Sequence, residues 1–228
     1  MRHTLMGDRV PDWSLRRPKP IWQRIYDFAA CPLRFVVLPD TVCERLHLTS
    51  LRAERFAQVL NEMQGRCLDI GAGDNALIRS YRDRCGDAEA KGDGAARSIG
   101  VDVTAWNDEV TVIETSAKLP FDDASFDTVT LVACLNHIPE RQDSLREAYR
   151  VLRPGGRIVL TMIERTLGAV GHRLWWYSEE KERDVDPHEE MGLDRKEMIG
   201  LLEAAGYRDI GVRSFCYGLN FVFVATRP

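Results

Sequence analysis

The stretch Cys67-Leu68-Asp69-Ile70-Gly71-Ala72-Gly73-Asp74-Asn75-Ala76-Leu77 predicts a buried parallel strand that turns tightly into a helix. Gly71 and Gly73 carry no Cβ atoms, so a ligand can lie against bare backbone at the turn. The helix that follows offers unpaired N–H groups and the positive end of its dipole. The stretch is therefore interpreted as a nucleoside-binding turn.

Two kinds of nucleoside ligand fit this turn. Together with Ala76, the two glycines read Gly-x-Gly-x-x-Ala, which is an accepted form of the dinucleotide fingerprint. Asp69 favours a different ligand, because a carboxylate at the mouth of the turn repels a diphosphate and attracts a cationic amino-acid headgroup. A structural role for Asp69, as a cap on the next helix, is the alternative.

Two motifs carry a resemblance to a known family. The pattern Asp-x-Gly-x-Gly resembles the first motif of the class I S-adenosylmethionine (SAM) dependent methyltransferases, which holds the methionine part of the cofactor. The order helix, Leu152-Arg153-Pro154-Gly155-Gly156, apolar strand is also similar to that family, and a helix stop followed by a tight turn is expected there. The resemblance covers residues 65–163 strongly and 192–228 in outline. It points to the subgroup of quinone-biosynthesis and small-molecule methyltransferases.

The resemblance implies an α/β fold and SAM as the cofactor. The expected fold is doubly wound, with a mostly parallel seven-stranded sheet, an antiparallel C-terminal hairpin and an N-terminal helical prelude. Asp102 ends a predicted strand at the position that binds the ribose hydroxyls. Thr115 stands where relatives carry an acid that contacts adenine, and Trp106 is either a stacking partner of adenine or a lid over the sheet edge. The implied cofactor contacts are Asp69, Gly71, Ala72, Gly73, Asp102, Val103, Thr115, Ser116, Ala117, Cys134 and Leu135.

His137 is the predicted catalytic residue. It follows the β-branched strand at 128–133, and ligands of open parallel sheets lie beyond the carboxyl ends of such strands. A histidine can take a proton from a hydroxyl acceptor near neutral pH. Packing and capping is the alternative role. His172 and His188 are further candidate bases, but they lie too far apart in an irregular stretch to predict a metal site.

Composition restricts the class of protein. The 228 residues are 44% hydrophobic and 29% charged, which is typical of one globular α/β domain. The net charge of −4 gives no basic field for nucleic acid. Six cysteines without Cys-x-x-Cys spacing predict reduced thiols in a cytoplasmic protein. No secretory signal or membrane-spanning segment is recognised, so no stable membrane association is expected.

The chain divides into three predicted parts. Residues 1–20 form a mobile or loosely docked arm, and 21–64 form a helical cap that in the resembled family shapes the acceptor pocket. Residues 65–228 form the methyltransferase domain, with a lid-like insertion at 164–192. Trp22, Tyr26 and Phe35 in the cap are expected to be core residues. An apolar surface that docks on a membrane to reach a lipid-like acceptor is the alternative.

The predicted function is SAM-dependent methyl transfer to a small-molecule acceptor, at oxygen, nitrogen or carbon. A non-catalytic SAM-binding or scaffold protein of the same fold stays open, because Thr115 replaces an acid and a crossover helix is missing between Asp102 and the third strand. A nicotinamide-dependent oxidoreductase is less favoured. Asp69, the Pro-Gly-Gly turn and the terminal hairpin all argue against that class.

Overall fold

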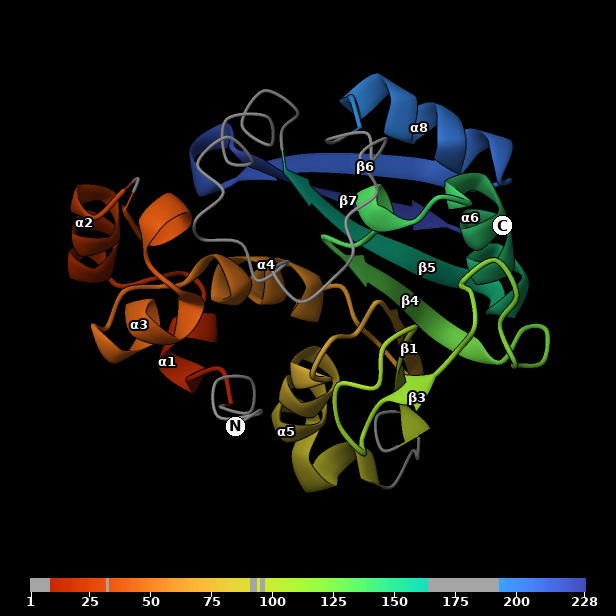
Figure 1. The fold of residues 1–228 in the computed structure, drawn as a ribbon, viewed down its shortest axis with the longest axis horizontal. Helices are drawn as coiled ribbons and strands as arrows, with labels where there is room; N and C mark the ends of the chain where they lie inside the picture. Colours follow the sequence, from red (N-terminus) through yellow and green to blue (C-terminus); the bar gives the residue numbers. More distant parts are fainter. Residues whose placement is uncertain (1–8, 32, 91–93, 95–96, 164–192) are drawn as a thin grey trace.

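A seven-stranded sheet, in the order β3-β2-β1-β4-β5-β7-β6, organises the computed structural model, which describes residues 9–31, 33–90, 94, 97–163 and 193–228 (Figure 1). Strands from β3 to β5 pair in parallel, whereas β7 runs antiparallel to β5 and β6. The strands are β1 (Cys67–Ile70), β2 (Ile99–Asp102), β3 (Thr111–Val112), β4 (Phe126–Val132), β5 (Leu152–Ile163), β6 (Arg208–Phe215) and β7 (Asn220–Thr226). The predicted fold class, including the C-terminal hairpin, is confirmed.

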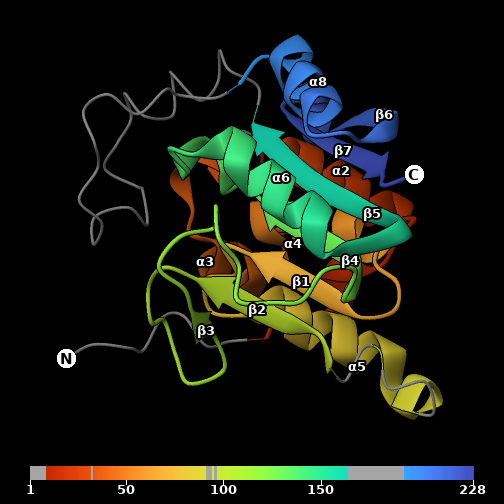
Figure 2. The same ribbon diagram turned by 90° about the vertical axis from the view of Figure 1, so that its right-hand side faces the viewer.

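Helices cover both faces of this sheet (Figures 1 and 2). The helical segments are α1 (Asp12–Leu15), α2 (Ile21–Ala29), η1 (Leu33–Val37), α3 (Asp40–Arg45), α4 (Leu51–Leu60), α5 (Ala76–Ala90), η3 (Leu135–His137), α6 (Arg141–Val151), α8 (Arg195–Ala204) and η6 (Cys216–Gly218). In β5, Ile158 and Leu160 pack with α6 and α8, and Val159 between them packs with α4 and α5. This alternation places apolar side chains on both faces of the strand, as a doubly wound sheet requires.

The Pro-Gly-Gly element lies inside β5 and not before it. Gly155 adopts a φ of 77° and donates its N–H to the Arg227 carbonyl at 2.7 Å. The β4–β5 register shifts between Phe126 and Thr128, so the extra residues form an irregularity within the paired strand. A Cβ at Gly156 would lie 2.8 Å from a carbonyl oxygen, which explains the second glycine.

The N-terminal residues from 9 onward are packed against the rest of the chain. Val10 is 4% exposed in the apolar cluster that contains α4 and α5. Arg17 and Lys19 both form ion pairs with Glu54 of α4, at 2.7 and 2.6 Å. Residues 9–20 are thus held by both apolar and charged contacts, and residues 1–8 of the predicted arm lie outside the described residues.

A buried polar cluster fixes α2 and η1 on α4. Arg34 is only 2% exposed, and its guanidinium donates to Glu54 and to the carbonyls of Asp27 and Thr49. The Asp27 carboxylate accepts hydrogen bonds from Lys19 and from the Thr49 hydroxyl. These bonds hold the pKa of Asp27 below its usual value against the opposing effect of burial. The inward side of α2 is therefore polar.

Because its polar side faces inward, α2 presents its apolar side to solvent. Trp22 is 78% and Tyr26 47% exposed, so the expectation that these two residues are core was wrong. Phe35 is half-buried, with its ring 4.0 Å from the Arg34 guanidinium. The sequence periodicity correctly predicted an amphipathic helix, but the direction of that helix is set by the charged residues that contact it.

Candidate active site

The turn predicted from Gly71 and Gly73 lies at the carboxyl ends of β1 and β2. These strands are parallel neighbours, with Ile70 opposite Val101, so the segments that follow them meet at one edge of the sheet. The N–H groups of Gly71 and Ala72 both donate to the Val101 carbonyl, at 2.9 and 3.0 Å. The turn is therefore held on β2 by backbone hydrogen bonds.

The two glycines of the turn have different roles. A Cβ at Gly71, whose φ is 72°, would lie 2.7 Å from the Cys134 Cβ, so Gly71 permits close packing of the segment after β4. Gly73 has a φ of 54°, and no atom lies within 4 Å of the position that its Cβ would take. Open backbone at this position leaves room for a ligand that lies directly on the turn.

Asp102 is half-buried beside this open backbone. Its Oδ2 accepts the Gly73 N–H at 3.0 Å, and its Oδ1 accepts the Thr104 N–H at 3.0 Å. Each carboxylate oxygen keeps a further acceptor site, so Asp102 can also receive two hydroxyl groups. Val103, the next residue, is 59% exposed. This arrangement fits the predicted ribose contact.

Asp69 lies inside β1 and is 2% exposed, so it does not stand at an open mouth of the turn. Its Oδ1 accepts a 2.6 Å hydrogen bond from the Thr130 hydroxyl, because β1 and β4 pair with these two residues opposite each other. Burial, together with the nearby charges of Asp102 and Asp74, raises the pKa of the Asp69 carboxyl to about 7, although the hydrogen bond from Thr130 opposes the shift. A cation bound close by would relieve this penalty.

The loop after β3 offers mainly backbone groups to a ligand. Ser116 is 6% exposed and its hydroxyl lies 2.7 Å from that of Ser144 on α6, so the side chain is engaged away from the turn. The Thr115 hydroxyl accepts the Ala117 N–H at 3.1 Å. Trp106 is half-buried, and its Nε1 has no hydrogen-bond partner among the described residues.

The segment after β4 carries the remaining predicted residues. Ala133 adopts a φ of 55°, and the Cys134 thiol donates to the Ile70 carbonyl at 3.0 Å. Burial raises the pKa of Cys134 far above its usual value, so the thiol is neutral. Leu135 is buried, and the half-buried His137 has its Nε2 3.0 Å from the Asn136 amide nitrogen. When this amide donates to Nε2, the imidazole proton resides on Nδ1.

The sequence analysis did not identify two residues that position the site. Thr130 can be recognised as a partner of Asp69 only when the register of β1 and β4 is known. Asn75 is 1% exposed with a φ of 66°, and its amide donates to the Glu109 carbonyl at 3.1 Å. The preference of asparagine for positive φ at the start of a helix is the signal that could have indicated Asn75.

The predicted lid at 164–192, with His172 and His188, lies outside the described residues. Among the residues that the structure describes, no cluster of His, Cys, Asp or Glu could hold a metal ion. None of the helices in that part of the chain is long and apolar enough to cross a membrane.

Comparisons with known proteins agree with this fold. Residues 68–160 match the family model described as a methyltransferase domain. A demethylmenaquinone methyltransferase of Staphylococcus epidermidis is 31% identical over 137 residues, which is 53% of this chain and 57% of the relative. The chain spans about half the length of the curated relatives it matches.

Solved structures show the same fold. A SAM-dependent methyltransferase of Thermotoga maritima, described as a possible histamine N-methyltransferase, superimposes with a TM-score of 0.55 and 20% identity over 77% of this chain and 88% of that chain. A SAM-dependent methyltransferase of Aquifex aeolicus superimposes with a TM-score of 0.53 and 17% identity, over 90% of this chain and 98% of that chain.

The seven-stranded sheet has the class I SAM-dependent methyltransferase architecture. Within it, this chain resembles the quinone-biosynthesis methyltransferases, as the sequence motifs predicted.

Proposed function

We propose that this chain binds SAM at the turn after β1 and transfers its methyl group to a small-molecule acceptor. The observation that carries the proposal is the pairing of Asp102 with the open backbone of Gly73 at the carboxyl edge of a parallel sheet. Ligands of such sheets bind at that edge. The quinone-biosynthesis relatives support a small acceptor, and the −4 net charge gives no reason to expect nucleic acid.

Each residue of the site has a role in binding or alignment under this proposal. Asp102 accepts hydrogen bonds from the ribose hydroxyls. The Asp69 carboxylate, which is buried behind the turn, stabilises the cationic amino-acid end of SAM through its electrostatic field. Thr115 and the backbone of Ser116 and Ala117 line the part of the site that holds the adenine. Bound SAM supplies an activated methyl group on a sulfonium. The protein aligns the acceptor with that methyl, which supplies most of the catalysis for an in-line displacement.

Two further parts of the chain complete the proposal. Residues 21–64 form a helical cap that borders the acceptor site. His137 takes the proton of a hydroxyl acceptor through its Nε2, which requires the Asn136 amide to release that atom. An amine or carbon acceptor would rely on alignment alone.

Calorimetric titration of the purified protein with SAM and S-adenosylhomocysteine tests the cofactor. We expect micromolar binding of both, and no binding of NAD(H) or NADP(H) in parallel titrations. Binding of a nicotinamide cofactor alone would overturn the proposed site. A screen of small aromatic and lipid-like nucleophiles with radiolabelled SAM then tests methyl transfer, and binding without transfer to any acceptor would favour the non-catalytic alternative.

His137→Ala is expected to lower turnover at least about tenfold while SAM affinity stays within a factor of two, because a general base acts on the acceptor and not on the cofactor. The pH profile of turnover separates this role from a structural one. Wild-type turnover that decreases at acidic pH, together with a variant that lacks this decrease, supports the base. Unchanged turnover in the variant would assign His137 to packing.

A further inference from the structure

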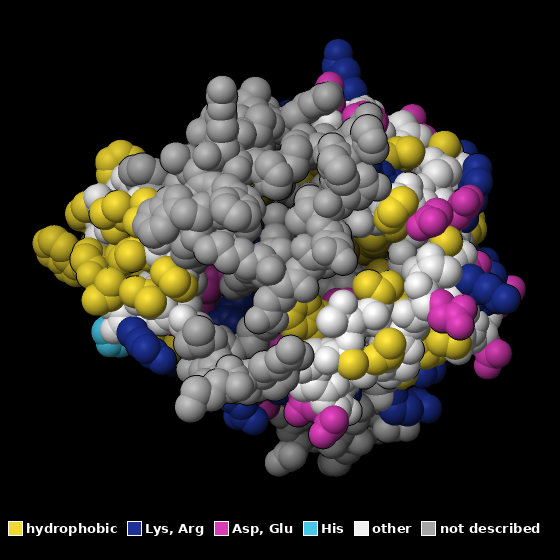
Figure 3. Space-filling view, viewed as in Figure 1, with side chains coloured by type: hydrophobic (Ala, Val, Ile, Leu, Met, Phe, Trp, Pro, Cys, Tyr) yellow, Lys and Arg dark blue, Asp and Glu magenta, His cyan; other side chains and the backbone are white. Residues whose placement is uncertain are grey.

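An apolar surface covers the outer side of α2. We call its four residues the α2 patch, and their exposed fractions are 65% for Ile21, 78% for Trp22, 54% for Ile25 and 66% for Phe28. Their spacing places them on one side of the helix. Figure 3 shows hydrophobic side chains gathered over this N-terminal region of the molecule. Contiguous exposed apolar side chains of this size mark an interaction site.

The α2 patch cannot turn inward. On the opposite side of the helix, Gln23 donates to the Asp27 carboxylate and to the His47 carbonyl, both at 2.9 Å. Asp27 is 1% exposed and is bound to Lys19 and Thr49. Rotation of α2 would leave these buried polar groups without partners, at a high cost in free energy. The helix therefore holds its apolar side outward.

The exposed charges near the α2 patch are mainly basic. Within residues 12–50 the exposed charged side chains are Arg16, Arg24 and Arg45, with Asp12 as the one exposed acid. Arg24 lies on α2 itself, whereas Asp12 lies on α1. Of the other acids in this segment, Asp27 and Glu44 are buried and paired with cations, and Asp40 is half-buried. An apolar helix face whose own exposed charge is basic is complementary to a surface that is both apolar and anionic.

We propose that the α2 patch docks reversibly on an anionic lipid surface. Trp22 and Tyr26 have the amphipathic rings that favour the membrane interface, and Ile21, Ile25 and Phe28 supply apolar area that enters the acyl boundary. Arg24 and its basic neighbours contact the lipid phosphates. A second copy of the chain fits less well, since a symmetric contact through this patch would bring the same arginines together. The docking involves no spanning segment, and it does not depend on SAM.

Vesicle co-sedimentation of the full chain tests this proposal. One set of vesicles is pure phosphatidylcholine, and the other is an equimolar mixture with phosphatidylglycerol. We expect binding to the anionic vesicles, at least about fivefold weaker binding to the neutral ones, and weakening by added salt. The double variant Trp22→Gln with Ile25→Gln should reduce binding to anionic vesicles at least tenfold. Both side chains point to solvent, so circular dichroism and the melting temperature should match the wild type.

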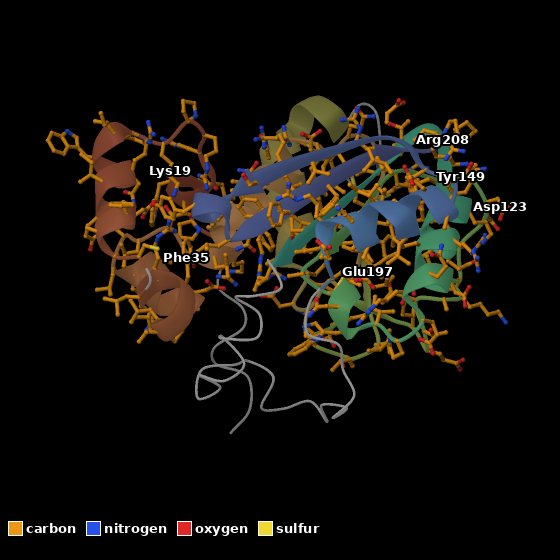
Figure 4. All side chains as sticks on the ribbon, turned by 90° about the horizontal axis from the view of Figure 1, so that it is seen from above. Lys19, Phe35, Asp123, Tyr149, Glu197 and Arg208 are labelled. Carbon is orange, nitrogen blue, oxygen red and sulfur yellow. The ribbon has the colours of Figure 1, made fainter. Side chains whose placement is uncertain are left out.

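Charge reversal supplies a matched control. Arg24→Glu should weaken binding to anionic vesicles at least about fivefold. Arg208→Glu changes the charge equally on an exposed residue of β6, at the opposite end of the molecule from Lys19 and Phe35 in Figure 4, and should leave binding unchanged. Equal loss from both variants would show a non-specific charge effect and overturn the proposal.

Two other results would also overturn it. Wild-type binding by the Trp22→Gln, Ile25→Gln variant would exclude the α2 patch. Failure of the wild type to bind anionic vesicles would exclude the lipid surface. In that case light scattering on the wild type and the double variant shows whether a second copy covers the patch.

Discussion

Asp102→Ala is expected to weaken SAM binding about a thousandfold, because the variant loses two charge-assisted hydrogen bonds to hydroxyls worth roughly 1.5–3 kcal/mol each. The loss has a second source. Asp102 Oδ2 also accepts the Gly73 N–H, so the variant loses the hydrogen bond that holds the tip of the turn as well as those to the ribose. Calorimetric titration with S-adenosylhomocysteine measures the effect without turnover.

Asp108→Ala is the control for this variant. Asp108 is an exposed acid on the same loop, and its removal changes the net charge equally, so its affinity should stay close to that of the wild type. The conservative Asp102→Asn variant should fall between the two, because the amide retains one acceptor oxygen. Wild-type affinity in Asp102→Ala would refute the ribose assignment.

The fold could be predicted because its signals are local. The strand-turn-helix at Cys67–Leu77, the acid that ends β2 and the C-terminal hairpin each lie within a short stretch of sequence. Parallel strands then bring the ends of β1, β2 and β4 to one edge of the sheet. The contact between Asp102 and Gly73 follows from this topology alone, so it could be predicted from the sequence. The same topology places the Cys134 segment against Gly71.

Other features depend on contacts between distant parts of the chain. The Thr130 hydroxyl reaches Asp69 only through the register of two strands that are far apart in sequence. The outward face of α2 follows from the convergence of Lys19, Arg34 and Thr49 on its inner side, and hydrophobic periodicity carries no information about such partners. Periodicity shows that a helix has two sides, but not which side is buried.

Asp69→Asn is expected to stabilise the SAM-free protein while weakening SAM binding. The pKa of Asp69 rises from an ordinary 3.8 to about 7 on folding, so the folded state binds more protons than the unfolded state between these values. The contribution of Asp69 to stability therefore falls as pH rises through this window, and the full penalty is present above pH 7. A pKa difference is worth about 1.4 kcal/mol per unit, so the gain at pH 8 reaches up to about 4 kcal/mol.

The pH dependence distinguishes this effect from a change in packing. Asparagine retains an oxygen to accept the Thr130 hydroxyl, so the contact at 2.6 Å can persist. Thermal unfolding should show a melting temperature several degrees higher for the variant at pH 8, and the difference should shrink toward pH 4. Equal melting temperatures at pH 8 would contradict the buried-charge explanation.

Cofactor affinity should change in the opposite direction. In the wild type, a cationic headgroup favours the ionised Asp69, so protons compete with SAM and affinity should fall as pH drops below about 7. Asp69→Asn removes the attraction to the headgroup together with the competition from protons. The variant should bind SAM about a hundredfold more weakly, on the scale of a buried charge interaction. Its affinity should not change between pH 5 and 8. Calorimetric titrations across this range test both statements. If affinity is retained, the Asp69 charge does not attract the headgroup, and the buried carboxyl then serves only the structure around Thr130.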